Sequence, residues 1–287
     1  MTTSRSGGVY SSRKDLRTLC LSILNSQLLT PSETRRWMKP LSGTGSLVEM
    51  VGAPWEIYRL AVPVTPDSNR TRVSDLYTKA GGSNDYTAVV ALSPDHGLGF
   101  SVLVAGPPRW AGPGRFVLRN ALGEVFIPAA EWAAVENAER NIIGTFVGEI
   151  SSTANLTLSL DKDGAGLVLD SVYVHDLDAR WVVAGYPSPQ PINGTFRLYP
   201  TDINSQSSAL SSLYTPGFTG SISHRLVVPQ EDARSAVEGG SGMFEKSFAW
   251  ANVGFFGVLD EFVLGFDCGR LVSVWSPGLE TTFRRAD

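Results

Sequence analysis

The chain has 287 residues, of which 43% are hydrophobic and 18% charged, and its formal net charge is −4. This composition is typical of a globular protein and excludes a mostly disordered one. The negative charge and the lack of a basic block argue against nucleic acid and anionic membranes as partners. The length favours two domains, and no apolar run reaches the roughly 18–20 residues of a spanning helix.

Two helices are predicted at the start of the chain. Apolar residues repeat at intervals of three and four across Asp15–Leu29, which predicts an amphipathic helix. Ser12-x-x-Asp15 before it is a capping pattern. Thr30-Pro31-Ser32-Glu33 predicts the start of a second helix that ends near Met38. We expect these helices to cover one face of a sheet.

An antiparallel sheet of about five strands is predicted next. The strands are expected at Leu47–Val51, at Trp55–Val62, from Val73 onward, at Thr87–Ser93 and at Leu98–Ala105. A helical stripe then covers Gly114–Arg140, which we expect to lie back on the sheet and to be broken or restarted at Pro128.

From Ile142 onward the apolar pattern changes to a period of two, so we place a domain boundary there, between residues 1–140 and 141–287. The spacing of the strands predicts a closed or nearly closed barrel, lipocalin-like, or a sandwich. Aromatic residues of this part should fill its core or line an apolar cavity. The strands are expected at Thr145–Ile150, Leu156–Leu160, Gly166–Val174, Trp181–Ala184, Gly194–Tyr199, Gly217–Leu226, Gly257–Phe266 and Leu271–Ser276, and the aromatic residues are Trp181, Tyr186, Phe196, Tyr199, Phe218, Trp250, Phe255 and Trp275.

The strand Tyr77-Thr78-Lys79-Ala80-Gly81-Gly82 contains a Lys-x-Gly box and is followed by two apolar strands. This arrangement resembles the Lys-Thr-Gly strand of the β-lactamase and penicillin-binding-protein family, and specifically the C-terminal portion of fungal, class C-like serine hydrolases. Five other segments are similar to that group: 7–16, 54–59, 141–146, 155–158 and 257–263. The resemblance implies an α+β fold, with a truncated β-lactamase-like antiparallel sheet and helices before the β-rich domain.

The family's chemistry requires a nucleophilic Ser-x-x-Lys and a Tyr-x-Asn or Ser-x-Asn motif. Ser11-Ser12-Arg13-Lys14 has the first spacing, but it aligns with a later helix entry of the family and is better explained as a helix cap. No Tyr-x-Asn occurs in the sequence. Serine hydrolysis by the family's usual route is therefore not expected.

The candidate site follows the Lys-x-Gly strand. Lys79 is the expected electrostatic catalyst or hydrogen-bond donor, because the neighbouring glycines permit close approach of a ligand to the backbone. Its expected catalytic neighbours are Tyr77 and Tyr86, and the expected substrate-binding residues are Gly81, Gly82, Ser83, Trp55 and Tyr58.

No metal site or cofactor is predicted. The three histidines have no partner at metal-ligand spacing, and Asp161-Lys162-Asp163-Gly164 reads as a hairpin turn rather than a calcium loop. Both cysteines, Cys20 and Cys268, are expected to be buried free thiols.

Three functions remain open. The first is a small-molecule enzyme of cyclase or isomerase type in fungal secondary metabolism, acting without a serine nucleophile on a natural-product-like substrate. The second is a non-catalytic binding or accessory protein, or a fragment that works beside a hydrolase. The third is a serine hydrolase with rearranged residues, using Ser11 or Ser83. A cytoplasmic location is expected, with secretion left open by three glycosylation sequons. The family's sheet-covering helices are partly lacking, so self-association is also expected.

Overall fold

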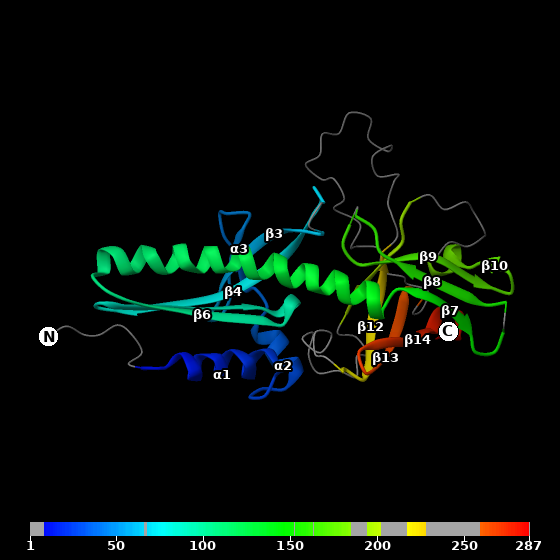
Figure 1. The fold of residues 1–287 in the computed structure, drawn as a ribbon, viewed down its shortest axis with the longest axis horizontal. Helices are drawn as coiled ribbons and strands as arrows, with labels where there is room; N and C mark the ends of the chain where they lie inside the picture. Colours follow the sequence, from blue (N-terminus) through cyan, green and yellow to red (C-terminus); the bar gives the residue numbers. More distant parts are fainter. Residues whose placement is uncertain are drawn as a thin grey trace, which may run out of the picture. The chain divides into compact units, whose positions relative to one another are not determined.

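The computed structural model describes residues 9–65, 68–151, 153–162, 164–184, 194–201, 217–227 and 259–286. The chain divides into two compact units (Figure 1). Unit 1 comprises Met1–Val135 with Ser208–Thr215, and unit 2 comprises Glu136–Ser207 with Pro216–Asp287. No helix in the described ranges has the length and apolar character needed to cross a membrane.

Unit 1 begins with the helices α1 (Arg13–Leu24) and α2 (Pro31–Trp37). The Ser12 side chain accepts a hydrogen bond from the backbone N–H of Asp15, which confirms the predicted cap. Thr30 and Glu33 form a complete capping box at α2. The prediction that the first helix continues to Leu29 was wrong, because the chain leaves the helix at Asn25 and Ser26 has a left-handed φ of 51°.

Six strands follow in an antiparallel sheet whose spatial order is the chain order. The prediction of about five strands lacked the two-residue β1, which pairs with β2. The strands are β1 (Ser42–Gly43), β2 (Glu49–Val51), β3 (Glu56–Pro63), β4 (Thr71–Ser83), β5 (Tyr86–Ser93) and β6 (Leu98–Ala105).

The two faces of this sheet bury different helices (Figure 1). On one face, residues of α1 and Met38 pack against Trp55, Ile57 and Leu92. On the other face, Ile127 packs with residues of β3, β4 and β5. Because successive side chains of a strand point to opposite faces, adjacent residues of β5 serve the two cores separately.

Gly99 on β6 permits the close approach of α1. A Cβ at this position would lie 2.9 Å from Leu92 Cδ2 and 3.2 Å from Cys20 Cβ. Both neighbours are core residues, so the lack of a side chain at Gly99 allows α1 to pack closely against the sheet.

The covering segment is a single helix, α3 (Pro108–Asn141), which lies along the sheet opposite α1 and α2 (Figure 1). We expected a break at Pro128, and that was wrong, since the helix continues through Pro128 and Pro113. The carbonyl that Pro128 leaves without its helical donor belongs to Glu124, an exposed residue, where water can solvate it. Ile127 beside the proline is only 1% exposed, so packing on the sheet holds the helix at this point.

Unit 2 is a closed antiparallel barrel. Eight of its strands form a ring in which β15 pairs with β7 and β8 pairs with β9. A short strand, β10 (Leu177–Asp178), pairs with β9 outside the ring. The ring consists of β7 (Gly144–Gly148), β8 (Asn155–Ser159), β9 (Leu167–Val174), β11 (Arg197–Pro200), β12 (Gly220–Val227), β13 (Glu261–Asp267), β14 (Arg270–Ser276) and β15 (Thr281–Arg285).

The interior of the barrel is filled by side chains. Twelve of them are at most 1% exposed, which favours the packed-core alternative over an apolar cavity. They are Phe146, Leu156, Leu158, Leu169, Val172, Phe196, Leu198, Phe262, Leu264, Leu271, Val274 and Phe283.

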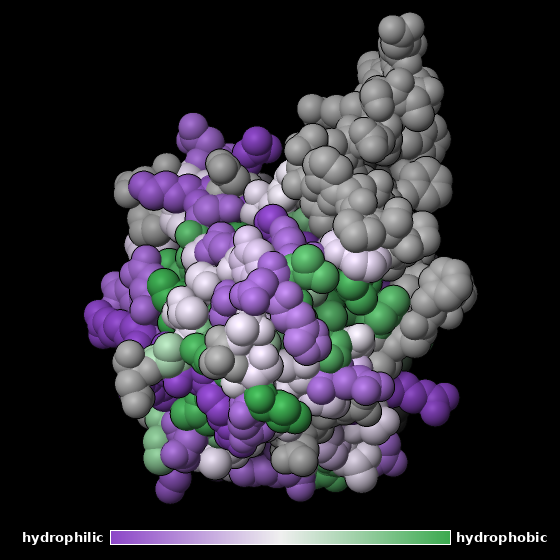
Figure 2. All heavy atoms as spheres, turned by 90° about the vertical axis from the view of Figure 1, so that its right-hand side faces the viewer, coloured by the Kyte–Doolittle hydropathy of each residue, from purple (hydrophilic) through white to green (hydrophobic). Residues whose placement is uncertain are grey.

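Three expectations for unit 2 need correction or restriction. Trp275 is 38% exposed and lies outside the packed interior, and Trp181 belongs to the short helix α4 (Arg180–Val183) rather than to a strand. Tyr186, Trp250 and Phe255 lie outside the described residues. On the face of unit 2 in Figure 2, hydrophilic and hydrophobic residues are interspersed.

The two cysteines differ in environment. Cys20 is buried against the sheet, as expected, and burial raises the pKa of its thiol. Cys268 is exposed, so the expectation that it is buried was wrong. It follows β13 in a tight turn with a left-handed φ of 48°, and this turn projects from the barrel rather than packing inside it.

Candidate functional site

Strand β4 extends past its neighbour β3 and so has an open edge. The pairing of β4 with β3 ends at Thr78, which lies opposite Glu56, whereas its pairing with β5 continues to Ser83. Residues 79–83 therefore have a ladder partner on one side only. Because N–H groups alternate between the two edges of a strand, Ala80 and Gly82 direct theirs to the open edge.

A carboxylate of the protein itself occupies this edge. Glu56 Oε1 lies 2.5 Å from Lys79 Nζ, and Glu56 Oε2 accepts a hydrogen bond of 3.3 Å from the Ala80 backbone N–H. The Lys79 side chain is 47% exposed and that of Glu56 36% exposed. The pair is thus accessible, and exposed ion pairs contribute only about 0–1 kcal/mol. The edge can therefore hold a carboxylate, and the internal one is easily displaced.

An aromatic cluster lies on the same face of the sheet as Lys79. Trp55 contacts Trp37 at 4.9 Å and Tyr77 at 6.2 Å between ring centroids. Burial, with the negative charges of Asp75 and Asp95, raises the pKa of Tyr77 to about 12. Its phenol stays protonated at neutral pH, so it can donate a hydrogen bond but cannot act as a base.

The structure brings only some of the other predicted site residues to this edge. Trp55 is buried in the core and 4% exposed, so it does not offer a surface to a substrate. Ser83 and Tyr86 close the β4–β5 hairpin, and Tyr86 is 69% exposed. Tyr58 lies on the opposite face, under the guanidinium of Arg119, so the structure does not bring it to Lys79.

The sequence did not predict that a cationic side chain, Arg115, contacts the segment of Gly81 and Gly82. Arg115 of α3 donates to the Gly81 carbonyl at 2.8 Å and also to the Thr87 hydroxyl. A Cβ on Gly82 would lie 3.5 Å from Arg115 Nη1, whereas a Cβ on Gly81 would meet nothing within 4 Å. Arg115 therefore ties the open-edged segment to α3, and Gly81 faces open space.

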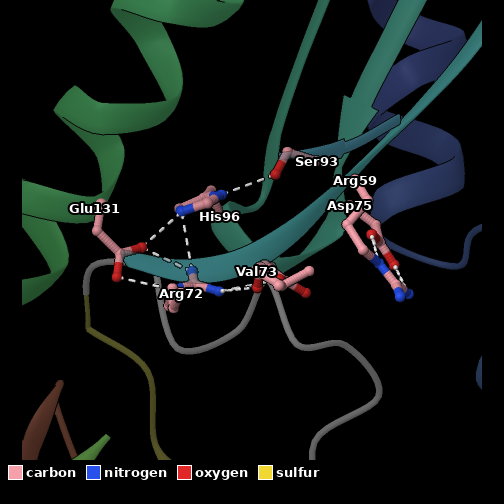
Figure 3. A network of polar contacts seen from close by, with 8 residues as sticks. Arg59, Arg72, Val73, Asp75, Ser93, His96 and Glu131 are labelled. Atoms are coloured by element: carbon pink, nitrogen blue, oxygen red, sulfur yellow. Dashed lines mark hydrogen bonds and ion pairs between the residues drawn. The ribbon is translucent and has the colours of Figure 1, made fainter. Parts of the chain in front are cut away.

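A second polar cluster, also missed from the sequence, joins β4, β5, η1 (Pro94–His96) and α3 (Figure 3). The Ser93 hydroxyl lies 2.8 Å from His96 Nδ1, and His96 Nε2 lies 2.8 Å from Glu131 Oε2. Arg72 donates to both oxygens of Glu131, at 2.8 and 2.7 Å, and to Asp95 at 3.2 Å. We refer to these five residues as the Arg72 cluster.

The Arg72 cluster has the residue types of a hydrolytic triad but not the accessibility. Ser93 is 1% exposed and His96 5% exposed, so a substrate cannot reach the hydroxyl. Burial alone would raise the pKa of Glu131, but hydrogen bonds from His96 and Arg72 outweigh it and hold the pKa at about 2. The carboxylate is already neutralised by Arg72 and serves to attach α3 to the sheet.

The two candidate nucleophiles, Ser11 and Ser83, have no carboxylate or imidazole partner among the described residues. The Ser11 hydroxyl contacts the neighbouring Ser12 carbonyl at 3.5 Å, and Ser83 ends strand β4. Ser12 donates to Asp15 Oδ2 at 2.8 Å, but this contact belongs to the helix cap. Within the described ranges, no group of three His, Cys, Asp or Glu side chains is placed to hold a metal ion.

His224 on β12 is a buried titratable group inside unit 2. Its ring is buried, with Nδ1 at 3.1 Å from the Ile222 carbonyl, and desolvation lowers the pKa to about 4. We expect the stability of unit 2 to fall as pH drops from about 6.5 to 4, by up to about 3 kcal/mol, because the unfolded chain binds the proton first. Acid unfolding followed by hydrogen exchange of barrel amides measures this loss.

Two variants isolate the contribution of His224. His224→Leu should flatten the pH dependence in that window, whereas His175→Asn, at an exposed turn position with a φ of 52°, should leave it unchanged. An unaltered acid transition in His224→Leu would contradict the assignment.

A family model described as "Beta-lactamase-like-like, C-terminal domain" matches residues 134–287. This chain belongs to the beta-lactamase-like family. The match covers the barrel, so the family resemblance of the sequence is confirmed.

Curated relatives of this beta-lactamase-like chain are fungal. A "Beta-lactamase-like protein" of Arthroderma benhamiae is 33% identical over 184 residues, covering 60% of this chain and 29% of that protein. A "Probable hydrolase" of Cochliobolus lunatus is 29% identical over 158 residues, covering 54% of this chain and 24% of that protein. The chain thus spans less than a third of the length of these relatives.

Among solved structures, an octameric penicillin-binding protein homologue from Pyrococcus abyssi matches with a TM-score of 0.29 and 12% identity. The match covers 95% of this chain and 46% of that one.

Proposed function

We propose that the open edge of β4 binds the carboxylate or carbonyl oxygen of a small molecule, and that Lys79 stabilises negative charge there without a covalent intermediate. The observation that supports the proposal is the position of the Glu56 side chain, whose carboxylate contacts Lys79 Nζ and the Ala80 N–H. Donors that already hold one carboxylate suit another anion, and the N–H of Gly82 adds a further donor on the same edge.

The chemistry that suits these groups is charge stabilisation. A reaction that builds negative charge on oxygen, such as a cyclisation or isomerisation through an enolate, is accelerated by donors aimed at that oxygen. Lys79 would supply the charge and the protonated Tyr77 a further hydrogen bond, with Trp55 and Trp37 supporting the strand from beneath. A natural-product-like substrate from fungal secondary metabolism fits the resemblance to the family.

Binding of a simple carboxylate tests the site before any substrate is known. Glu56→Gln keeps the side-chain size and removes the competing charge, so the affinity for benzoate should rise about two- to five-fold, as expected for loss of an exposed ion pair. Lys79→Ala should abolish binding, and Lys39→Ala, at an exposed lysine of the same unit, should not change it. NMR shifts of Ala80 and Gly82 amides give the dissociation constants.

Benzamide serves as the neutral ligand control. It should not compete with benzoate, because it lacks the charge that Lys79 attracts. Equal benzoate affinity in wild type and Lys79→Ala would place anion binding elsewhere and defeat the proposal.

Hydrolysis is the second candidate, favoured by two fungal relatives that are each named a "Probable hydrolase". In that reaction the same edge would polarise a carbonyl, and a serine such as Ser11 or Ser83 would attack it. Stoichiometric labelling of either serine by a fluorophosphonate would support hydrolysis. A third role, binding without turnover, predicts saturable ligand binding that depends on Lys79 and no product.

A further inference from the structure

The outer side of α3 carries a line of uncharged residues that no described element of unit 1 covers. Its positions follow spacings of 4, 3, 4, 4, 3 and 4 residues, so they occupy a sector of roughly 80° around the helix. Four of the side chains are large and exposed: Trp110 is 69%, Val117 66%, Val125 63% and Trp132 38% exposed. The full line, which we call the α3 seam, consists of Trp110, Gly114, Val117, Ala121, Val125, Pro128 and Trp132.

Three charged residues of α3 point away from the seam and towards the sheet. Arg115 is bonded to Gly81, Arg119 lies over Tyr58, and Glu131 belongs to the Arg72 cluster. Two exposed charged residues flank the seam instead: Glu124 lies beside it, and Arg109 lies over the Trp110 ring at 5.8 Å. An apolar stripe on the outer side of a helix whose other side already packs on a sheet is typical of a helix that is covered from both sides.

The seam is a palindrome about Ala121. Trp110 and Trp132 each lie eleven positions from Ala121. Gly114 and Pro128 each lie seven positions from it, and Val117 and Val125 each lie four positions from it. A repeat of eleven residues drifts only about 20° around a helix, so the seam runs almost straight along the axis. Such a line matches itself when a second helix is laid beside it in the opposite direction.

We infer that the α3 seam is the contact between two copies of this chain, related by a two-fold axis at Ala121. In this antiparallel pair Trp110 packs against Trp132 of the second copy and Val117 against Val125 of the second copy. The small Ala121 lets the helices approach at the axis. A two-fold interface requires a self-complementary surface of this kind.

The exposed area suffices for a stable contact. Aromatic side chains bury about 150–250 Å² each, and Leu118, which is 48% exposed, flanks the seam. Together the exposed fractions offer on the order of 600 Å² per copy, or ~1,200 Å² in total, above the roughly 1,000 Å² expected of a specific interface. The inference does not depend on the proposed function.

Oligomeric state and one charge substitution test the contact. Sedimentation equilibrium at tens of micromolar should give twice the 30.9 kDa chain mass. Ala121→Arg places two like charges at the axis and should yield monomers, with at least ten-fold weaker association. Ala133→Arg, at an exposed alanine of α3 outside the seam, should stay dimeric. Ala121 is exposed, so circular dichroism of Ala121→Arg should match the wild type.

Cysteine cross-linking tests the direction, in a Cys268→Ser background. With a short bismaleimide, Ala121→Cys should cross-link to its own copy. Val117→Cys should not, because in an antiparallel pair the two 117 positions lie about 12 Å apart along the axis. Val117→Cys with Val125→Cys should cross-link.

Three results would overturn the inference. A monomer at every concentration would mean that something other than a second copy covers the seam. A dimer that survives Ala121→Arg would use another surface. Equal cross-linking by Ala121→Cys and Val117→Cys would indicate parallel helices.

Discussion

Lys79→Ala should lower turnover of the native substrate by about 10²–10³-fold, the loss typical of removing a donor aimed at developing negative charge. The variant also leaves the Glu56 carboxylate at the open edge with only the Ala80 N–H as its partner, which further disfavours an anionic ligand. Product formation in the presence of fungal metabolite extracts, followed by mass spectrometry, measures the effect.

Two matched variants separate this role from general damage. Lys39→Ala should retain full turnover. Ser12→Ala removes the α1 cap and should cost about 1 kcal/mol of stability while leaving turnover nearly intact. Full activity in Lys79→Ala would show that the active site does not lie at β4.

Glu131→Gln should destabilise unit 1 by about 3 kcal/mol, because the largely buried Arg72 guanidinium loses its bidentate partner and keeps only the Asp95 carboxylate at 3.2 Å. A similar figure follows from the depressed pKa: a carboxyl at about 2 that titrates at about 4.5 when unfolded contributes roughly 3 kcal/mol above pH 4.5, lost as pH falls towards 2. Hydrogen exchange of α3 amides near Glu131 reports the loss in unit 1 separately.

The matched control lies on the same helix. Glu124 is exposed, so Glu124→Gln should change α3 protection by less than about 0.5 kcal/mol. Arg72→Met combined with Glu131→Gln should cost less than the sum of the single changes, since the two side chains bond each other and each single change leaves the other without that partner. Wild-type protection in Glu131→Gln would show that α3 is held by apolar packing alone.

Local patterns in the sequence determined most of the elements of this protein. The cap at Ser12, the capping box at Thr30, the Lys79 strand and the alternation in β8 depend on residues a few positions apart, and such patterns can be read directly. The period of two in the second half of the chain predicted a closed or nearly closed barrel or a sandwich, and the barrel is what the structure shows. Pro128 misled the prediction, because a local helix breaker was overridden by packing of Ile127 on the sheet.

The tertiary structure decided what these elements do together. The open edge at Lys79 exists because β3 begins at Glu56, 23 positions earlier, and the barrel closes through the pairing of Phe283 with Gly148. The Arg72 cluster joins residues 24, 35 and 59 positions apart, so His96 carried no recognisable signal in the sequence. Contacts over such separations depend on the register of the strands and on where a helix packs against the sheet. The sum of many weak packing interactions determines both, so no short stretch of sequence specifies them.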